Sequence, residues 1–156
     1  MNGVLGVRAE PAAVHWAIVS GTPDHLILDA HGSEVAPDSY KEGESLAWIR
    51  QRVLHILDTY RPTKVGVKYP ERNAMGANKD AAKCRCRVEG VVLEAASTQN
   101  LVTVTGALGT FGKFIHSKSP ATDLGAEDLR GLDWSRFKDK KMREAIYVAA
   151  SVLTEG

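Results

Sequence analysis

A short apolar run at 64–69 lies between two segments with helical periodicity, and this arrangement restricts the fold more than any other feature of the sequence. In the segment 45–60, apolar residues recur every three or four positions, which is typical of a helix with one apolar face. The segment 79–98 has a similar apolar side. The Val-Gly-Val centre of the short run is apolar at consecutive positions, as expected for a central parallel strand that is buried on both faces. This order of helix, buried strand and helix predicts an α/β fold.

Three strand-like runs precede this unit, at 3–8, 12–20 and 25–30. The connection Ala-Glu-Pro at 9–11 is short enough for a hairpin. The sequence Gly-Thr-Pro-Asp at 21–24 is a strong turn signal. Consecutive strands joined by tight turns pair with their neighbours, so the sequence predicts an antiparallel three-strand meander.

The remaining segments complete the pattern. We expect loops at 31–44 and 70–78, a strand at 101–105, a short helix or turn at 106–118, an irregular stretch at 119–139 and a closing helix at 140–153. A chain of 156 residues is most simply one domain, and no linker or repeat divides it. The sequence therefore predicts a single α/β domain over 1–156, with a mixed five-stranded sheet (the meander plus two parallel strands) flanked by helices.

Composition excludes several classes of protein. Lys and Arg total 20 against 19 Asp and Glu, so net charge does not point to any kind of partner. No apolar run approaches the roughly 20 residues that span a bilayer, and the N-terminus does not resemble a signal peptide. We therefore expect a cytoplasmic protein. Cys84 and Cys86 would point roughly 200° apart on a helix, which suits neither a disulfide between them nor a shared metal.

The distribution of charge is more informative than its total. Basic residues outnumber acidic ones in the segment 64–87, which holds two acids, Glu71 and Asp80. A basic stretch of this kind either faces phosphates or forms the solvated side of a helix. The cations that could form a phosphate-facing rim are Lys68, Arg72, Lys79, Lys83, Arg85, Arg87, Lys113 and Lys118.

Four local segments stand out: Val-Leu-Gly-Val at 4–7, His-Trp-Ala-Ile-Val at 15–19, the passage 54–67 and the segment 83–96. In this order they resemble the RuvC/YqgF branch of the RNase H-like superfamily, which includes Holliday junction resolvases. The first two segments resemble the first and second strands of that group. The passage 54–67, with Arg-Pro before Lys-Val-Gly-Val, resembles its helix-to-fourth-strand connection, and 83–96 its next helix. The matches are short, and it is their order along the chain that carries the resemblance. It implies an RNase H-like fold and a homodimer.

Active members of that group place an Asp on the first strand, a Glu at the end of the fourth strand and acids on the last helix, where they hold two divalent metals. The matching positions here are Arg8, Lys68 and Glu144. Two unit charges about 4 Å apart interact by about 4 kcal/mol at an effective dielectric near 20, so each cation opposes a metal ion strongly. The resemblance therefore implies a nuclease fold with a degenerate metal site.

Two arrangements of the remaining acids are open. Glu10 and Glu71 lie close in sequence to the two cations, and together with Glu144 they could converge on Mg²⁺ or Mn²⁺ as relocated ligands. Alternatively, Glu144 forms an ion pair with Arg8 or Lys68 and fills the former metal site without a metal. His15, on a predicted strand, is expected to be structural.

The function that follows is a catalytically silent RuvC-like protein that binds nucleic acid or a protein partner through its basic face, without a cofactor. A metal-dependent nuclease that uses Glu10, Glu71 and Glu144 is the first alternative. A non-enzymatic assembly module is the second.

Overall fold

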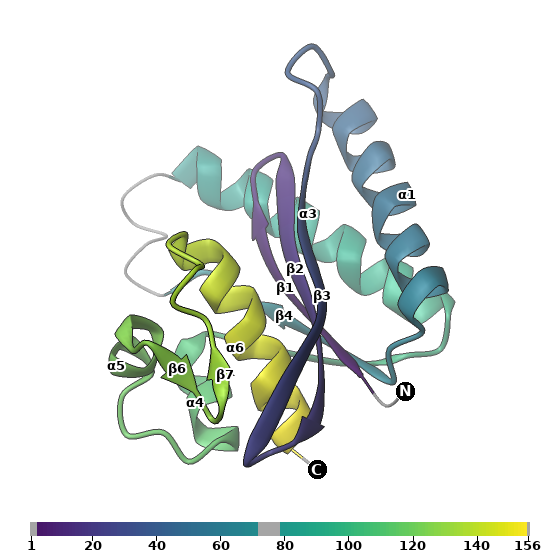
Figure 1. The fold of residues 1–156 in the computed structure, drawn as a ribbon. Coiled ribbons are helices and arrows are strands. Elements are labelled where there is room, and N and C mark those ends of the chain that lie inside the picture. Colours follow the sequence, from purple (N-terminus) through teal and green to yellow (C-terminus); the bar gives the residue numbers. More distant parts are fainter. Residues whose placement is uncertain (1–2, 72–78, 156) are drawn as a thin grey trace.

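The computed structural model describes residues 3–71 and 79–155 (Figure 1). Its main sheet has five strands in the order β3-β2-β1-β4-β5. The strands are β1 (Val4–Glu10), β2 (Ala13–Thr22), β3 (His25–Val35), β4 (Lys64–Lys68) and β5 (Val102–Gly106). The long helices are α1 (Glu42–Tyr60), α3 (Lys79–Thr98) and α6 (Lys140–Thr154). β2 is antiparallel to β1 and β3, whereas β1, β4 and β5 are parallel, which confirms the predicted fold class.

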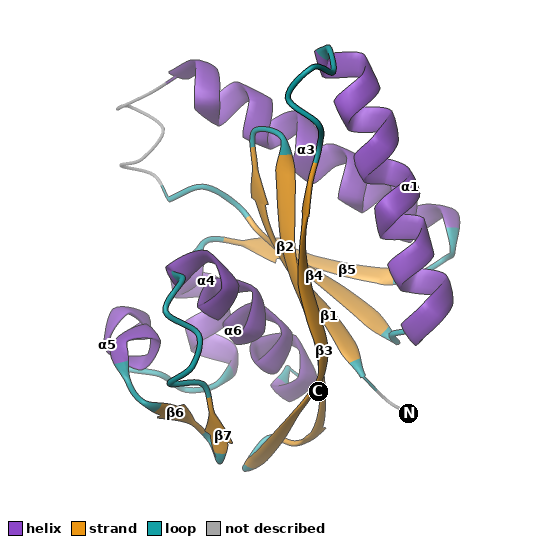
Figure 2. Ribbon diagram, turned by 45° about the horizontal axis from the view of Figure 1, so that its top comes forward, coloured by secondary structure: helices purple, strands orange, loops and turns teal. Residues whose placement is uncertain are grey.

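Helices cover both faces of this sheet, with α1 and α3 on one side and α6 on the other (Figures 1 and 2). Because successive side chains of a strand point to opposite faces, β1 divides its residues between two cores. Leu5, Val7 and Ala9 pack with α1 and α3, whereas Val4 packs with α6. Arg8 therefore projects to the α6 face.

Two glycines allow α6 to lie close to the sheet. Gly6 and Gly66 are partners in the parallel register of β1 and β4. A Cβ on Gly6 would lie 2.2 Å from the carbonyl oxygen of Ala145, and a Cβ on Gly66 would lie 2.6 Å from a methyl of Val152. These contacts set the depth of α6 over the strand ends, and with it the position of the polar residues in its first turns.

The third strand and the first helix are longer than the sequence predicted. β3 continues to Val35 because 31–35 pairs with 13–17 of β2, where we expected a loop. α1 begins at Glu42 rather than near 45, and the Lys41 amide donates to Glu44 Oε1 at 3.1 Å in its first turn. The polar composition of 31–44 obscured both extensions.

The stretch expected to be irregular contains regular elements. After α4 (Leu108–Phe114), which agrees with the predicted short helix or turn, come α5 (Pro120–Gly125), β6 (Asp128–Leu129) and β7 (Leu132–Asp133). β6 and β7 form a small second sheet, which the sequence did not predict because each strand has two residues. Trp134 is fully buried against α6, so this segment is fixed to the body of the protein.

Most of the predicted loop 70–78 lies outside the described residues. Within the described part of the chain, no helix combines the length and the apolarity needed to cross a bilayer.

Candidate functional site

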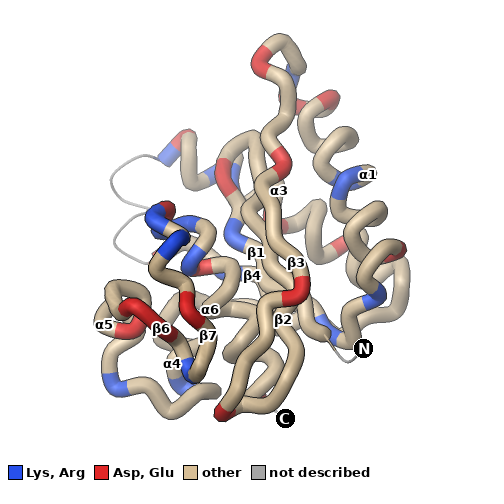
Figure 3. Tube along the Cα trace, in the orientation of Figure 1, with Lys and Arg blue, Asp and Glu red and all other residues tan. Residues whose placement is uncertain are grey.

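Cationic side chains meet at the carboxyl ends of the parallel strands. Arg8 and Lys68 are partners in the register of β1 and β4, and Lys68 is paired in turn with Gly106 on β5. The start of α6 lies over the same edge, and Lys and Arg positions gather there (Figure 3). The two cations that the sequence placed at the ends of separate strands are therefore neighbours in space.

Arg8 is bound to Glu144 of α6. Its Nε donates to Glu144 Oε2 at 2.8 Å, and its Nη1 donates to the carbonyl oxygen of Ala9 at 2.6 Å. The two side chains are 17% and 6% exposed, respectively. The structure thus contains one of the two ion pairs considered from the sequence. Such a pair holds the guanidinium in place, because neither charge can easily lose its partner in a buried setting.

Lys68 is almost completely buried, with 1% of the residue exposed. Its Nζ lies 2.9 Å from Glu71 Oε2 and donates to the carbonyl oxygen of Tyr69 at 3.2 Å. Burial lowers the pKa of Lys68, and the attraction of Glu71 and Glu144 opposes this effect. Burial by itself would raise the pKa of Glu71, but hydrogen bonds from Lys68 and from the Leu108 amide outweigh it and lower that pKa.

Arg85 reaches the same place from α3, on the opposite side of the sheet. It donates from Nε to Glu89 Oε2 at 3.0 Å and from Nη2 to the carbonyl oxygen of Lys68 at 3.2 Å. Burial lowers the pKa of Arg85, and the nearby positive charge of Arg8 lowers it further. Burial also raises the pKa of Glu89, against the attraction of Arg85. Two cations from different layers of the fold thus face each other.

Glu10 binds two partners that the sequence did not assign to the site. One carboxylate oxygen accepts from Lys141 Nζ, and the other lies within hydrogen-bond distance of His15 Nε2. Burial would raise the pKa of Glu10, but these two hydrogen bonds and charges lower it overall. Lys141 precedes Glu144 by three residues, so the helical spacing could have indicated that both face the sheet.

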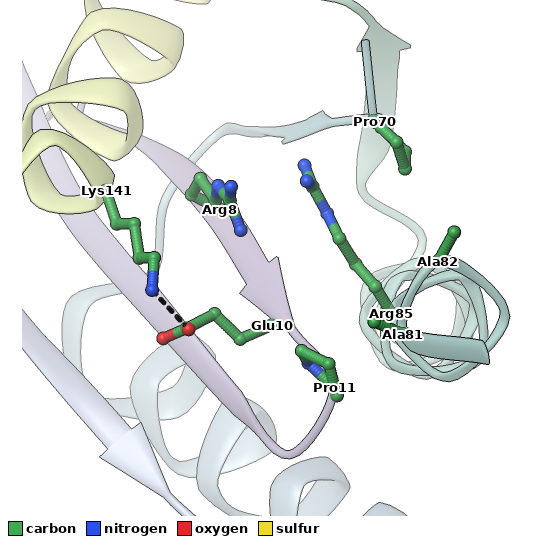
Figure 4. A pocket seen from close by; sticks show the side chains of 8 residues that line it. All are labelled: Arg8, Glu10, Pro11, Pro70, Ala81, Ala82, Arg85 and Lys141. Atoms are coloured by element: carbon green, nitrogen blue, oxygen red, sulfur yellow. Dashed lines mark hydrogen bonds and ion pairs between the residues drawn. The ribbon is translucent and has the colours of Figure 1, made fainter. Parts of the chain in front are cut away.

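Four of these side chains line a cavity of about 230 Å³. It is lined by Arg8, Glu10, Pro11, Pro70, Ala81, Ala82, Arg85 and Lys141. Figure 4 shows Arg85 extending from α3 toward Arg8, with Lys141 and Glu10 on the α6 side.

The solved structures that resemble this fold include Holliday junction resolvases. RuvC of T. thermophilus in complex with a Holliday junction substrate is 16% identical to the chain, with a TM-score of 0.76 over 97% of this chain and 92% of that one. Another Thermus thermophilus RuvC structure is 18% identical, with a TM-score of 0.73 over 96% and 92% of the two chains. The yeast mitochondrial Holliday junction resolvase is 10% identical, with a TM-score of 0.64 over 97% and 78%.

The chain has the RNase H-like fold of RuvC-type resolvases. At these identities the similarity establishes the fold alone. No protein-family model and no curated protein matches the sequence.

The RuvC-type fold implies a site for divalent metals, but the residues present do not suit one. Glu10, Glu71 and Glu144 are each bound to a different cation: Lys141, Lys68 and Arg8, respectively. Within 3–71 and 79–155, no group of three or more His, Cys, Asp or Glu residues is placed to hold a metal ion. A metal ion could bind these three carboxylates only after it displaced the ammonium and guanidinium groups that are paired with them.

The expected rim residues of this RuvC-type fold occupy different environments. Lys79 and Lys83, at the start of α3, are exposed, whereas Lys68 and Arg85 lie beneath the surface rather than on it. Arg87 is exposed and pairs with Glu42 at 2.9 Å. Lys113 is exposed at the end of α4, and Lys118 lines a separate hollow beside Arg130. Arg72 lies outside the described residues.

Proposed function

We propose that this protein is a non-cleaving relative of the RuvC-type resolvases that binds nucleic acid through its cationic edge. We use this name for the carboxyl ends of the parallel strands, where Arg8, Lys68 and Arg85 gather. The main support is the pair Arg8 and Lys68 at adjacent strand ends, where the resemblance would place metal-binding acids. Both cations are fixed by carboxylates rather than free to move aside. A site built in this way is unsuited to two-metal hydrolysis, whereas Arg8, whose side chain is 17% exposed, can still donate to a phosphate oxygen.

The exposed lysines at the start of α3 support the nucleic-acid part of the proposal. Lys79 and Lys83 are solvent-exposed on the helix that also carries Arg85, so phosphates of a long ligand could contact them beside the cavity. One of the similar structures is a RuvC bound to a Holliday junction. We propose a branched or duplex nucleic acid, bound without sequence preference, because contacts of this type are made to phosphates rather than to bases.

Binding is tested by fluorescence anisotropy with a labelled four-way junction and a matched duplex at several salt concentrations. Lys83→Glu should weaken binding and reduce the salt dependence by about one counterion, since each phosphate contact contributes a slope of roughly 0.9. Lys64→Glu is the matched control, because Lys64 lies at the amino end of β4, on the opposite edge of the sheet from Lys68. An equal loss in both variants would indicate a nonspecific effect of charge and would contradict the proposed interface.

Cleavage is tested on the same junction with Mg²⁺ or Mn²⁺. We expect no product. Cutting that Glu144→Ala abolishes would instead support the nuclease with relocated acids. Absence of salt-sensitive binding to either DNA would favour a protein partner or an assembly module. We also propose a cytoplasmic homodimer, by resemblance to the resolvases, and light scattering of the purified chain tests the dimer.

A further inference from the structure

Three cationic side chains from three elements line one cavity at the strand ends. Arg8 comes from β1, Arg85 from α3 and Lys141 from α6, and Glu10 is the carboxylate among the lining residues (Figure 4). The three elements that carry these four side chains are far apart in the sequence, so the cavity exists only in the folded protein. At roughly 30 Å³ for each water molecule, its volume of about 230 Å³ admits a phosphate group together with water.

Both guanidinium groups have hydrogen-bonding capacity beyond their ion pairs. Arg8 uses Nε and Nη1, and Arg85 uses Nε and Nη2, in hydrogen bonds to other described residues. The remaining Nη of each makes no hydrogen bond within the described part of the chain. Both arginines line the cavity, and their side chains are 17% and 10% exposed, respectively.

The two guanidinium groups also repel each other. Arg85 is buried, and after burial the charge of Arg8 is the largest influence that lowers the pKa of Arg85. Their carboxylate partners, Glu89 and Glu144, bind the Nε atoms, on the inner side of each guanidinium. An anion between the outer N–H groups would relieve the repulsion and accept hydrogen bonds from both arginines, a geometry that favours a phosphate.

We propose that this cavity binds a single phosphate group, held by Arg8, Arg85 and Lys141. The inference rests on the proposed nucleic-acid binding and specifies its central contact. The phosphate is either the terminal monoester of a 5′-phosphorylated strand or an internal diester. Both present oxygens to two guanidinium groups, and the two sources differ in charge and in what continues beyond the phosphate.

Glu10 acts against this ligand. Its carboxylate accepts a hydrogen bond from the Lys141 ammonium group and adds a negative charge to the cavity wall. A phosphate must compete with Glu10 for the ammonium group and tolerate its charge. Removal of that charge should therefore tighten phosphate binding, whereas a purely structural role for Glu10 predicts lower stability without any gain in affinity.

The test uses the full chain and three probes: inorganic phosphate by calorimetry, and one labelled single-stranded oligonucleotide with either a 5′-phosphate or a 5′-hydroxyl. Glu10→Gln should tighten binding of phosphate severalfold, and Lys141→Ala should weaken it by about tenfold, as expected for loss of a charged hydrogen bond. Lys140→Ala is the matched control, because Lys140 is the preceding residue of α6 and lines a different hollow. It should not change the affinity.

The two oligonucleotides separate the sources of the phosphate. Tighter binding of the 5′-phosphorylated strand that Lys141→Ala abolishes identifies a terminal monoester. Equal binding of the two strands, with the same sensitivity to Glu10→Gln and Lys141→Ala, identifies an internal diester. Weaker or unchanged phosphate binding in Glu10→Gln would overturn the proposal, as would an equal loss in Lys140→Ala and Lys141→Ala.

Failure of the cavity can be distinguished from failure of the broader function. If Lys83→Glu weakens junction binding while the Glu10 and Lys141 variants leave every probe unchanged, the cavity is not a phosphate site and the cationic edge still binds nucleic acid. If none of the three variants alters binding, both proposals are wrong.

Discussion

Removal of the Glu144 charge should destabilise the protein, because this buried carboxylate compensates several cations at the strand ends. Glu144 is 6% exposed and accepts from Arg8 at 2.8 Å, and its charge also attracts Lys68 and Arg85. Loss of one member of a buried pair costs about 3–5 kcal/mol, because the other charge is left without compensation. Arg8 keeps its bond to the Ala9 carbonyl, and Gln can still accept a hydrogen bond, so we expect the lower end, about 3 kcal/mol, for Glu144→Gln.

For a chain of this length, each kcal/mol lowers Tm by about 2–4 °C, so Glu144→Gln should melt about 6–12 °C below the wild type. Calorimetry and urea unfolding followed by circular dichroism measure the change, with an unaltered m-value as a check on two-state behaviour. Glu94→Gln is the matched control. Glu94 binds Arg50 at the same 2.8 Å, but both side chains are largely exposed, and Tm should stay near that of the wild type.

The double variant Arg8→Met with Glu144→Gln tests the cause. Removal of both charges leaves neither member of this pair without its partner, and apolar replacements of buried pairs are often neutral or stabilising. Most of the lost Tm should return. Equal decreases in Tm in Glu144→Gln and Glu94→Gln would refute the idea that Arg8, Lys68 and Arg85 need the Glu144 carboxylate. A double variant as unstable as Glu144→Gln would refute it as well.

Three further predictions address the packing, the titration and the metal chemistry. Gly6→Ala should unfold the protein or lower its Tm sharply, because the new Cβ would lie 2.2 Å from a backbone oxygen of α6. Gly90→Ala, at an exposed helix position with nothing within 4 Å, should stabilise the protein by about 1 kcal/mol, and thermal melts compare the two variants. Because the pKa of Glu10 is lowered in the folded state, its stabilising contribution is present above the unfolded pKa of 4.5 and is lost as pH falls through the folded pKa. In acid unfolding, Glu10→Gln should therefore lose less stability below about pH 5 than the wild type, and identical curves would contradict this. Arg8→Asp combined with Lys68→Glu supplies the acids that the resemblance expects at these positions. Once circular dichroism shows that this variant is folded, calorimetry should detect Mn²⁺ binding in it and none in the wild type. Mn²⁺ binding of equal strength in both proteins would contradict the proposal of a degenerate metal site.

Much of the architecture was predictable because it depends on local patterns. The apolar run at 64–69 and the helical stripes on either side of it indicated a central strand with crossover helices, and β4 and α3 lie where they were expected. The ends of elements were less predictable. The residues 31–35 look like a loop by composition, and they form a strand because β2 is long enough to pair with them.

The candidate site was predictable only in part. The sequence placed cations at the ends of two strands, since strand ends follow from the apolar runs. It placed Lys68 and Arg85 on a phosphate-facing rim, and considered Lys68 also as a partner of Glu144, because a charge run on an expected helix or strand does not show what packs over it. The structure buries both beneath the strand edge, each beside a carboxylate. It also brings Lys141 and His15 to Glu10, which no local spacing linked.

By itself, the sequence determined the order of strands and helices and the presence of basic residues at the ends of two strands, because both can be read from neighbours along the chain. Only the tertiary structure decided which charges meet. Arg8 and Lys68 are 60 positions apart and become adjacent through parallel pairing, and α6 can approach them because two glycines leave room for it. Contacts of this kind depend on register and packing depth, and neither is encoded in any single segment.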